Sequence, residues 1–365
     1  MRTYQGSIIT KTPITPSGPY QCGAASGVWT IDQMVGWQKA GLWPTAGNAY
    51  GTVGIFAIGN STTTRNKYTY SGDTNGTATA SSAASCAGSA AGNSIVGIFA
   101  LGNCTTTRNK YTYFGDVNAS ATASSAAFAA GSAAGNANVG IFALGYTTAP
   151  STTRDKYTYS GCVNSSGTAA SAASYFGSAA GNATVGIFAI GYVCSLGSTT
   201  TRNKYTYSGD VTASATASSS TSGYGSAAGN ATVGIFALGN NLTTRDKYTY
   251  SGCVNASATA SSAVSLYGSA TGNSTVGIFA LGGTTTRNKY TYSGDTNGTA
   301  TASSATSSYG SAAGNSTVGI FALGNNLTTR DKYTYSGCVV SSGAAASAAS
   351  ALGSAASNGT TGVNV

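Results

Sequence analysis

Short apolar segments recur along this chain at a nearly constant spacing. The segment Val-Gly-Ile-Phe-Ala-(Leu/Ile)-Gly begins at seven positions, 42 to 48 residues apart: Val53, Val96, Val139, Val185, Val233, Val276 and Val318. A second segment, Arg-(Asn/Asp)-Lys-Tyr-Thr-Tyr, follows each of them. A period near 43 residues is typical of propeller blades or of helical arrays.

Glycines interrupt these segments too often for long helices, which favours strands. In the first repeat we expect strands at Val53–Ile58, Lys67–Ser71, Thr77–Ser82 and roughly Ala87–Ala91. Four antiparallel strands are typical of one propeller blade. The sequence therefore predicts an all-β fold, a seven-bladed β-propeller over residues 45–365.

Closure of the ring is also expected from the sequence. A propeller protects its sheet edges only when its last blade meets its first. The segment Gly353–Asn358 follows the seventh repeat and resembles Gly88–Asn93, which leads into the second apolar segment.

Residues 1–44 lack the repeat and contain all three tryptophans, Trp29, Trp37 and Trp43. Thr30 and Gln33 have the spacing of a capping box, which predicts one short helix from about Ile31 to Lys39. A single helix does not fold alone. We therefore expect this segment to anchor the chain to the propeller or to a neighbouring protein, with the tryptophans as contacts.

Composition and charge exclude several classes of function. Only 7% of the residues are charged, and the net charge of +9 is spread evenly, with one Arg, one Lys and one carboxylate in each repeat. Nucleic-acid binding requires a clustered basic surface, which this pattern does not predict. No apolar run approaches the roughly 18 residues of a membrane span, and no apolar signal core begins the chain. We expect neither nucleic acid binding nor membrane insertion.

The repeated carboxylates alternate between two positions. Where the second segment reads Arg-Asn-Lys, an Asp follows seven residues after the Asn, and where it reads Arg-Asp-Lys, that later residue is Cys. Each blade thus keeps one carboxylate, which indicates a structural ion pair in which both positions share one cation. The expected ion-pair residues are Asp73, Asp116, Asp155, Asp210, Asp246, Asp295 and Asp331.

Catalysis is not expected. The chain has no histidine, which removes the usual general base and the commonest transition-metal ligand. A catalytic pair is unique and a calcium site needs several oxygen ligands, whereas these acids recur once in each repeat. The seven cysteines show no Cys-x-x-Cys spacing, which favours free thiols. We predict a protein that is not an enzyme and has neither metal nor cofactor.

Variable positions are the candidates for binding, because insertions in repeat proteins collect on loops of the binding face. The third and fourth repeats insert Tyr146–Thr152 and Tyr192–Ser198 between the two segments. The candidate ligand or partner contacts are Tyr146, Pro150, Tyr192 and Leu196.

A second variable position lies before the glycine that opens the last strand of each repeat. Its residues suit either packing between blades or stacking on a sugar ring. They are Ala87, Phe128–Ala130, Phe176, Tyr224, Tyr267, Tyr309 and Leu352.

Two resemblances add to this reading. Gly54–Gly59 followed by Tyr68–Asp73 resembles a kelch repeat, although one glycine replaces the usual pair and Ala and Thr stand where a Trp is expected. Residues 23–44 resemble a motif of structural proteins of tailed phages and other large viruses, and the repeats resemble those of phage tail-fibre-like proteins. These resemblances imply a virion component.

The function that follows is a tail-fibre-like protein on a virion surface, assembled in the host cytoplasm and binding a host receptor, with glycan as the expected ligand. Other virion proteins and further copies of the chain are the expected partners. Two alternatives remain open: a capsid decoration or cement protein, and a cellular sugar-binding propeller.

Overall fold

The structure, a computed structural model, describes residue 30, residues 32–33 and 35–36, and residues 52–358 apart from 114–116, 147, 161–162, 194–196, 210, 252–254 and 337–339. The chain divides into two units, Met1–Tyr50 and Gly51–Val365. No helix in the described part of the chain is long and apolar enough to cross a membrane.

In the first unit, Thr30 caps a helical turn that includes Asp32, Gln33, Val35 and Gly36. The amide of Gln33 donates to Thr30 Oγ1 at 3.2 Å, and the amide of Thr30 donates to Gln33 Oε1 at 2.9 Å. These two bonds are the predicted capping box. The rest of the expected helix lies outside the described residues.

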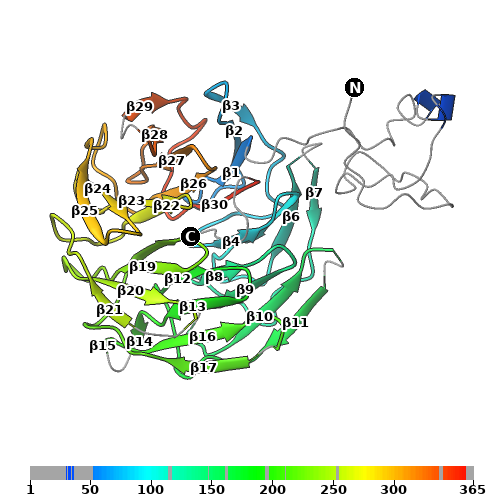
Figure 1. The fold of residues 1–365 in the computed structure, drawn as a ribbon. Helices are drawn as coiled ribbons and strands as arrows, with labels where there is room; N and C mark the ends of the chain where they lie inside the picture. Colours follow the sequence, from blue (N-terminus) through cyan, green and yellow to red (C-terminus); the bar gives the residue numbers. More distant parts are fainter. Residues whose placement is uncertain are drawn as a thin grey trace. The chain divides into compact units, whose positions relative to one another are not determined.

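The second unit is a ring of seven four-stranded antiparallel sheets, or blades (Figure 1), so the predicted all-β propeller is confirmed. The innermost strands of blades 1 to 7 are β30 (Ser354–Ser357), β4 (Ser89–Gly92), β8 (Ser132–Gly135), β12 (Ser178–Gly181), β18 (Ser226–Gly229), β22 (Ser269–Gly272) and β26 (Ser311–Gly314). The second strands are β1 (Val53–Ala57), β5 (Val96–Ala100), β9 (Val139–Ala143), β13 (Val185–Ala189), β19 (Val233–Ala237), β23 (Val276–Ala280) and β27 (Val318–Ala322).

The third strands carry the Arg-(Asn/Asp)-Lys-Tyr-Thr sequence: β2 (Arg65–Thr69), β6 (Arg108–Thr112), β10 (Arg154–Thr158), β16 (Arg202–Thr206), β20 (Arg245–Thr249), β24 (Arg287–Thr291) and β28 (Arg330–Thr334). The outermost strands are β3 (Thr74–Thr77), β7 (Val117–Ser120), β11 (Val163–Gly167), β17 (Val211–Ala215), β21 (Asn255–Ala258), β25 (Thr296–Ala300) and β29 (Val340–Gly343). A small hairpin, β14 (Tyr192–Val193) with β15 (Gly197–Ser198), extends blade 4.

The second strands form the core because alternate side chains face opposite neighbours. In blade 1, Ile55 packs against Phe99 of blade 2, while Phe56 packs against Ile320 of blade 7. Burying an Ile or Phe side chain contributes about 1.5–3 kcal/mol. The glycine of this strand makes room for a tyrosine: a Cβ on Gly97 would lie 2.9 Å from the Tyr113 hydroxyl.

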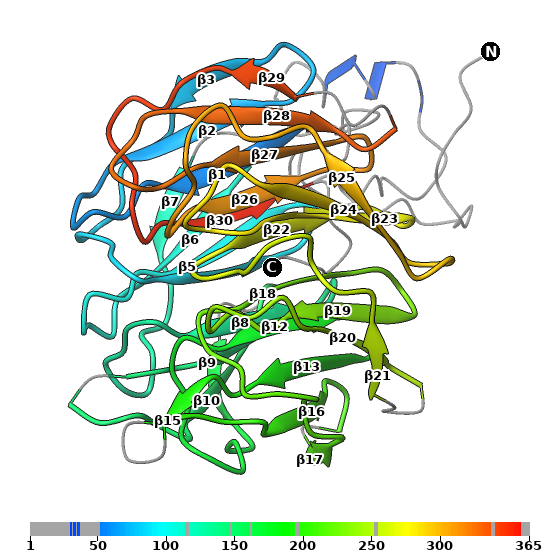
Figure 2. The same ribbon diagram turned by 90° about the vertical axis from the view of Figure 1, so that its left-hand side faces the viewer.

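The ring closes through the C-terminal strand. β30 pairs with β1, with Ala57 opposite Ser354 and Gly54 opposite Ser357. The amide of Val53 also donates to Asn358 Oδ1 at 2.9 Å. The outer strands β3 and β29 of the first and last blades lie next to each other in both views (Figures 1 and 2). The expected closed ring is confirmed.

Three expected strands of the first repeat are placed differently. The second strand is Arg65–Thr69 rather than Lys67–Ser71. The third strand is Thr74–Thr77, not Thr77–Ser82, because a tight hairpin pairs Thr69 with Thr74. The fourth strand, β4, is the innermost strand of the next blade rather than of its own repeat. The blade boundary is therefore shifted by one strand from the sequence repeat.

Two sets of loops lie at the same end of the ring, which we call the mouth face. Antiparallel order brings the loop between the second and third strands to the same end as the segment that enters each inner strand. Isolated bridges join these loops, for example Thr62 with Ser85 and Thr105 with Phe128. The variable positions that the structure describes lie on this face.

Candidate functional site

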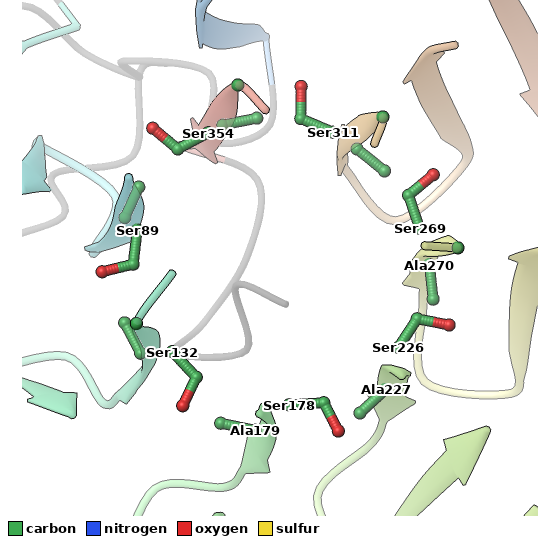
Figure 3. A pocket seen from close by; sticks show the side chains of 18 of the residues that line it. Ser89, Ser132, Ser178, Ala179, Ser226, Ala227, Ser269, Ala270, Ser311 and Ser354 are labelled. Atoms are coloured by element: carbon green, nitrogen blue, oxygen red, sulfur yellow. The ribbon is translucent and has the colours of Figure 1, made fainter. Parts of the chain in front are cut away.

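A channel runs along the axis of the ring between the inner strands (Figure 3). Each blade contributes a Gly-Ser-Ala triplet to its wall, such as Gly88-Ser89-Ala90 in blade 2. None of the residues that line this cavity is charged. Because an inner strand pairs on one side only, its other backbone edge faces the channel.

The mouth of the channel is encircled by one residue from each blade, a set that we call the rim: Ala87, Ala130, Phe176, Tyr224, Tyr267, Tyr309 and Leu352. The amide of each rim residue donates to the carbonyl of the rim residue in the preceding blade, at 2.7–3.1 Å. Seven such bonds form a closed ring of backbone around the axis.

Every rim residue has a positive φ, between 50° and 58°. This left-handed conformation costs an L-residue about 1–2 kcal/mol and favours glycine. Bulky residues nevertheless occupy five of the seven rim positions. Bulky side chains in such a conformation are most common where they have a function.

The rings of Phe176, Tyr224, Tyr267 and Tyr309 touch in sequence around the rim. Their centroids are 4.4 Å, 4.5 Å and 3.9 Å apart, and the last pair is stacked with an interplanar angle of 27°. All four side chains are half-buried. Together with Tyr175, Tyr146 and Tyr192 they form the aromatic arc.

The hydroxyls of the arc are also connected. Burial raises the pKa of Tyr309, and a side-chain hydrogen bond with Tyr267 adds to this increase. Burial likewise raises the pKa of Tyr224, with smaller contributions from Tyr267. These two hydroxyls are therefore neutral at physiological pH, and they lie beside apolar ring surface.

The two insertions join this arc. The ring of Tyr175 lies 5.4 Å from that of Tyr146, 5.2 Å from that of Tyr192 and 4.9 Å from that of Phe176. Pro150 bridges to Tyr146 within its own loop. The structure thus brings together three of the four predicted loop residues, while Leu196 lies outside the described residues.

Tyr175, which connects the insertions to the rim, was not predicted from the sequence. Its position, directly before Phe176, holds Cys, Ala, Gly, Leu, Ser and Ala in the other repeats. An aromatic residue unique to blade 4, next to both insertions in space, was the available signal.

The predicted acidic residues lie away from the arc, between blades. Asp155 of blade 3 is fully buried, and its Oδ2 lies 2.9 Å from Arg108 Nη2 of blade 2. The amide of Ser125 donates to the same oxygen at 2.9 Å. Asp246 with Arg202 and Asp331 with Arg287 form equivalent buried ion pairs.

In blades with Asn at this position, the amide oxygen takes the place of the carboxylate and accepts from the arginine of the preceding blade. Arg330 Nη2 donates to Asn66 Oδ1 at 3.0 Å, and its Nη1 donates to Asn75 Oδ1 at 2.6 Å. Its guanidinium also lies 4.7 Å from the centre of the Phe56 ring. Burial lowers the pKa of Arg330 to about 10, so this cation stays protonated at neutral pH.

The second acidic position is not adjacent to the first, contrary to our expectation for Asn66 and Asp73. In the β2–β3 hairpin Asn66 pairs with Thr77, whereas Asp73 lies at the turn beyond Thr74. Asp73 Oδ1 instead accepts a hydrogen bond from Ala344 N of blade 7 at 3.4 Å. Thr259 donates to the main-chain oxygen of Asp295, and Asp116 and Asp210 lie outside the described residues.

Other predicted features are placed as follows. The described residues contain no group of three His, Cys, Asp or Glu side chains that could hold a metal ion. Cys86 and Cys104 are free thiols, as predicted. Trp29, Trp37 and Trp43 lie outside the described residues, so their anchoring role stays a prediction.

Comparison with known proteins supports the architecture alone. No family model matches this sequence, and no curated protein matches it. Among solved structures, the chain is similar to the one described as the structure of YjhT, at 10% identity and a TM-score of 0.52, over 70% of this chain and 93% of that one. A shared propeller fold does not define a function, so function must be argued from the site.

Proposed function

We propose that this chain is an attachment protein of a virion surface, and that its propeller binds carbohydrate on the host cell through the aromatic arc. The observation that carries the proposal is the arc itself. It places ring surface and hydroxyls at the mouth of an uncharged channel, on the face where the blades differ.

Carbohydrate suits this chemistry. The C–H faces of a pyranose pack on aromatic rings, while its hydroxyls need neutral donors and acceptors. The residues around the mouth supply tyrosine hydroxyls and main-chain carbonyls, and none carries a formal charge. An anionic or cationic ligand would lose hydration there without gaining a charged partner.

The virion assignment rests on resemblance. Residues 23–44 resemble a motif of phage and large-virus structural proteins, and the repeats resemble those of tail-fibre-like proteins. In this proposal, residues 1–44 bind other virion proteins or further copies of the chain, and the propeller faces outward. Labelling intact particles with an antibody against the chain tests this part; a chain absent from particles contradicts it.

A glycan array probed with the full chain tests the binding part. We expect a defined set of neutral glycans to be retained. Tyr309→Ala should weaken their binding about tenfold, which corresponds to about 1.4 kcal/mol, within the range of one aromatic contact. Alanine is the residue that blades 2 and 3 carry at the rim, so the substitution suits the fold.

Val211→Ala is the matched control, because Val211 is 52% exposed on the outermost strand β17, away from the mouth. Binding that both substitutions reduce equally, or that neither reduces, contradicts the site. The absence of any retained glycan contradicts carbohydrate binding.

A further inference from the structure

The rim is not equally filled around its circumference. Four successive positions, in blades 4 to 7, carry aromatic rings, blade 1 carries Leu352, and blades 2 and 3 carry only the methyl groups of Ala87 and Ala130. Ala130 is 9% exposed, whereas Ala87 is half-buried and more accessible. The rim therefore has a gap above Ala87, which we call the notch.

Within the arc, each ring contacts the next: Phe176 and Tyr224 are tilted, Tyr224 and Tyr267 meet edge-on, and Tyr267 and Tyr309 are stacked. Tyr267 and Tyr309 stack at 3.9 Å, a distance that leaves no space for a sugar between them. The side of each ring that contacts its neighbour is therefore occupied. A pyranose that packs against an apolar surface needs a place where the series of rings stops, and the notch is such a place.

The notch is bounded on several sides. Along the rim it is flanked by Leu352 and, beyond Ala130, by Phe176. Radially outward, Cys86 bridges to Gly102 and Ala129 bridges to Tyr146, so loops of the mouth face form a wall. Below lies the channel lined by Gly-Ser-Ala triplets, and the closed backbone ring of the rim surrounds its entrance. A ligand would therefore enter the notch from the side that faces away from the ring.

The notch also offers hydrogen-bond acceptors. The carbonyl of Ala87 accepts the amide of Ala130 at 2.7 Å, and that of Leu352 accepts the amide of Ala87 at 2.9 Å. Each carbonyl has two lone pairs, so each retains one for a ligand hydroxyl. Neither charge nor a metal cluster is present among the residues that line the mouth.

We propose that the notch receives a single terminal pyranose, uncharged, of the carbohydrate whose binding is proposed above, and that this residue determines specificity. Its C–H face packs between Leu352 and the aromatic end at Phe176, and its hydroxyls donate to the rim carbonyls. The remainder of the glycan leaves along the tyrosine edges of the arc. This inference rests on the proposed function and adds which residue of the glycan is recognised.

The chain provides the variants for a test at its own repeat position. Ala87→Tyr introduces the residue that blades 5 to 7 carry at the rim, and it fills the notch without altering the arc. Ala87→Leu introduces the residue of blade 1 and provides a second, smaller filling. Val211→Ala, on the outermost strand β17 away from the mouth, is the control. Circular dichroism and thermal unfolding establish that each variant is folded.

The probe is an array of neutral oligosaccharides, each printed with its terminal residue free and with that residue capped by a sialic acid. We expect Ala87→Tyr and Ala87→Leu to weaken binding at least tenfold, an effect that one filled pocket readily produces. Val211→Ala should bind within about twofold of the wild type, and capping of the terminal residue should abolish binding. If Ala87→Tyr binds as the wild type does, or if capped and uncapped glycans bind equally, the proposal that the notch receives a terminal pyranose is wrong.

The two proposals fail separately. If Tyr309→Ala loses binding while Ala87→Tyr keeps it, the arc binds carbohydrate and the notch does not. If no neutral oligosaccharide binds the wild type, the proposed function fails and the notch with it. Retention of an aromatic peptide instead of a glycan also overturns both.

Discussion

The amide of Ala87 donates a hydrogen bond of 2.9 Å to the carbonyl of Leu352, and this bond completes the backbone ring at the mouth of the channel. Ala87 precedes the inner strand of blade 2, whereas Leu352 precedes the C-terminal strand β30, which completes blade 1. The two ends of the repeat array thus meet twice, at the rim and in the β1–β30 pairing.

Deletion of residues 351–365 should abolish the stable ring. It removes β30, exposes the inner edge of β1 and leaves the core contact between blades 1 and 7 without its innermost strand. Exposed strand edges promote association with other chains. We expect oligomers by size-exclusion chromatography and loss of a cooperative thermal transition. Deletion of residues 359–365 alone retains β30 and Asn358 and should behave as the wild type.

Glycine substitutions should separate backbone cost from side-chain contact at the rim. Ala87→Gly removes only a methyl group at a φ of 51°, and we expect an increase of about 0.5–1 kcal/mol in the free energy of unfolding. Tyr267→Gly removes the same backbone strain at a φ of 57°, but it also removes two ring contacts. We therefore expect no net increase in its free energy of unfolding. Urea unfolding measures both. A stabilised Tyr267→Gly variant contradicts the importance of the ring contacts.

The strands were partly predictable because each repeat carries its own pattern. The segment Val53–Ile58 predicted β1 within one residue, since its alternate side chains pack on two neighbouring blades. The outer strand β3 was misplaced because Thr-Asn-Gly-Thr is short, polar and largely exposed, so only the turn after Thr69 determines its position. The assignment of β4 to the next blade depends on ring closure, which no single repeat encodes.

The site was predictable as a set of variable positions but not as an assembly. Tyr146 and Tyr192 were identified from insertions, and Tyr224 and Tyr309 from variation before a glycine. Their contacts depend on the order of blades around the axis and on Tyr175, which fits no repeat pattern. The alternation between two acidic positions predicted that both share one cation. The structure instead pairs Asp155 with Arg108 of the neighbouring blade, whereas Asp73 accepts a hydrogen bond from the amide of Ala344. The strand register and the order of blades determine these partners.

Substitution of Asp155 should show how much the buried ion pairs contribute. Asp155→Asn places the residue of blades 1, 2, 4 and 6 in blade 3, so the amide fits, but hydrogen bonds to a charged acceptor are lost. We expect a loss of about 1–2 kcal/mol in the free energy of unfolding. Asp155→Ala leaves Arg108 buried without its carboxylate, and we expect a loss of about 3–5 kcal/mol. Equal losses in urea unfolding contradict this order.

Alkaline conditions should destabilise the fold through the tyrosines that follow the third strands. Burial raises the pKa of each of these seven side chains: Tyr70, Tyr113, Tyr159, Tyr207, Tyr250, Tyr292 and Tyr335. In the unfolded chain they release protons near pH 10, while the folded chain retains them. The free energy of unfolding therefore falls as pH rises above about 10, by up to about 1.4 kcal/mol per pH unit for each tyrosine.

Buried arginines act in the opposite direction. Burial lowers the pKa of Arg65, Arg154 and Arg330 to about 10 and that of Arg245 to about 9. Their deprotonation in the folded state relieves the cost of burying a cation as pH rises. Burial also lowers the pKa of Arg108, Arg202 and Arg287, where the paired aspartate opposes the decrease. The raised pKa values of Tyr224 and Tyr309 act in the same direction as those of the seven buried tyrosines. Nine tyrosines therefore oppose seven arginines, and net destabilisation is expected. Urea unfolding at about pH 8 and about pH 11, together with tyrosinate absorbance, measures it; equal stability at both values contradicts it.

Shortening the two insertions should weaken attachment without disturbing the ring. Replacing Tyr146–Thr152 and Tyr192–Ser198 with the short connection of blade 1 removes the two rings that contact Tyr175, but it leaves the rim from Phe176 to Tyr309 intact. A Tyr175→Ala variant with both loops retained separates the loss of these ring contacts from the loss of loop backbone. We expect glycan affinity to fall a few-fold, less than for Tyr309→Ala, because each aromatic contact contributes about 0.5–1.5 kcal/mol.

On particles, loss of adsorption with intact assembly supports receptor binding by these loops. Loss of assembly indicates that the loops contact a neighbouring virion protein, and no change in either assay means that they are passive and that Tyr146, Pro150 and Tyr192 are not part of the site.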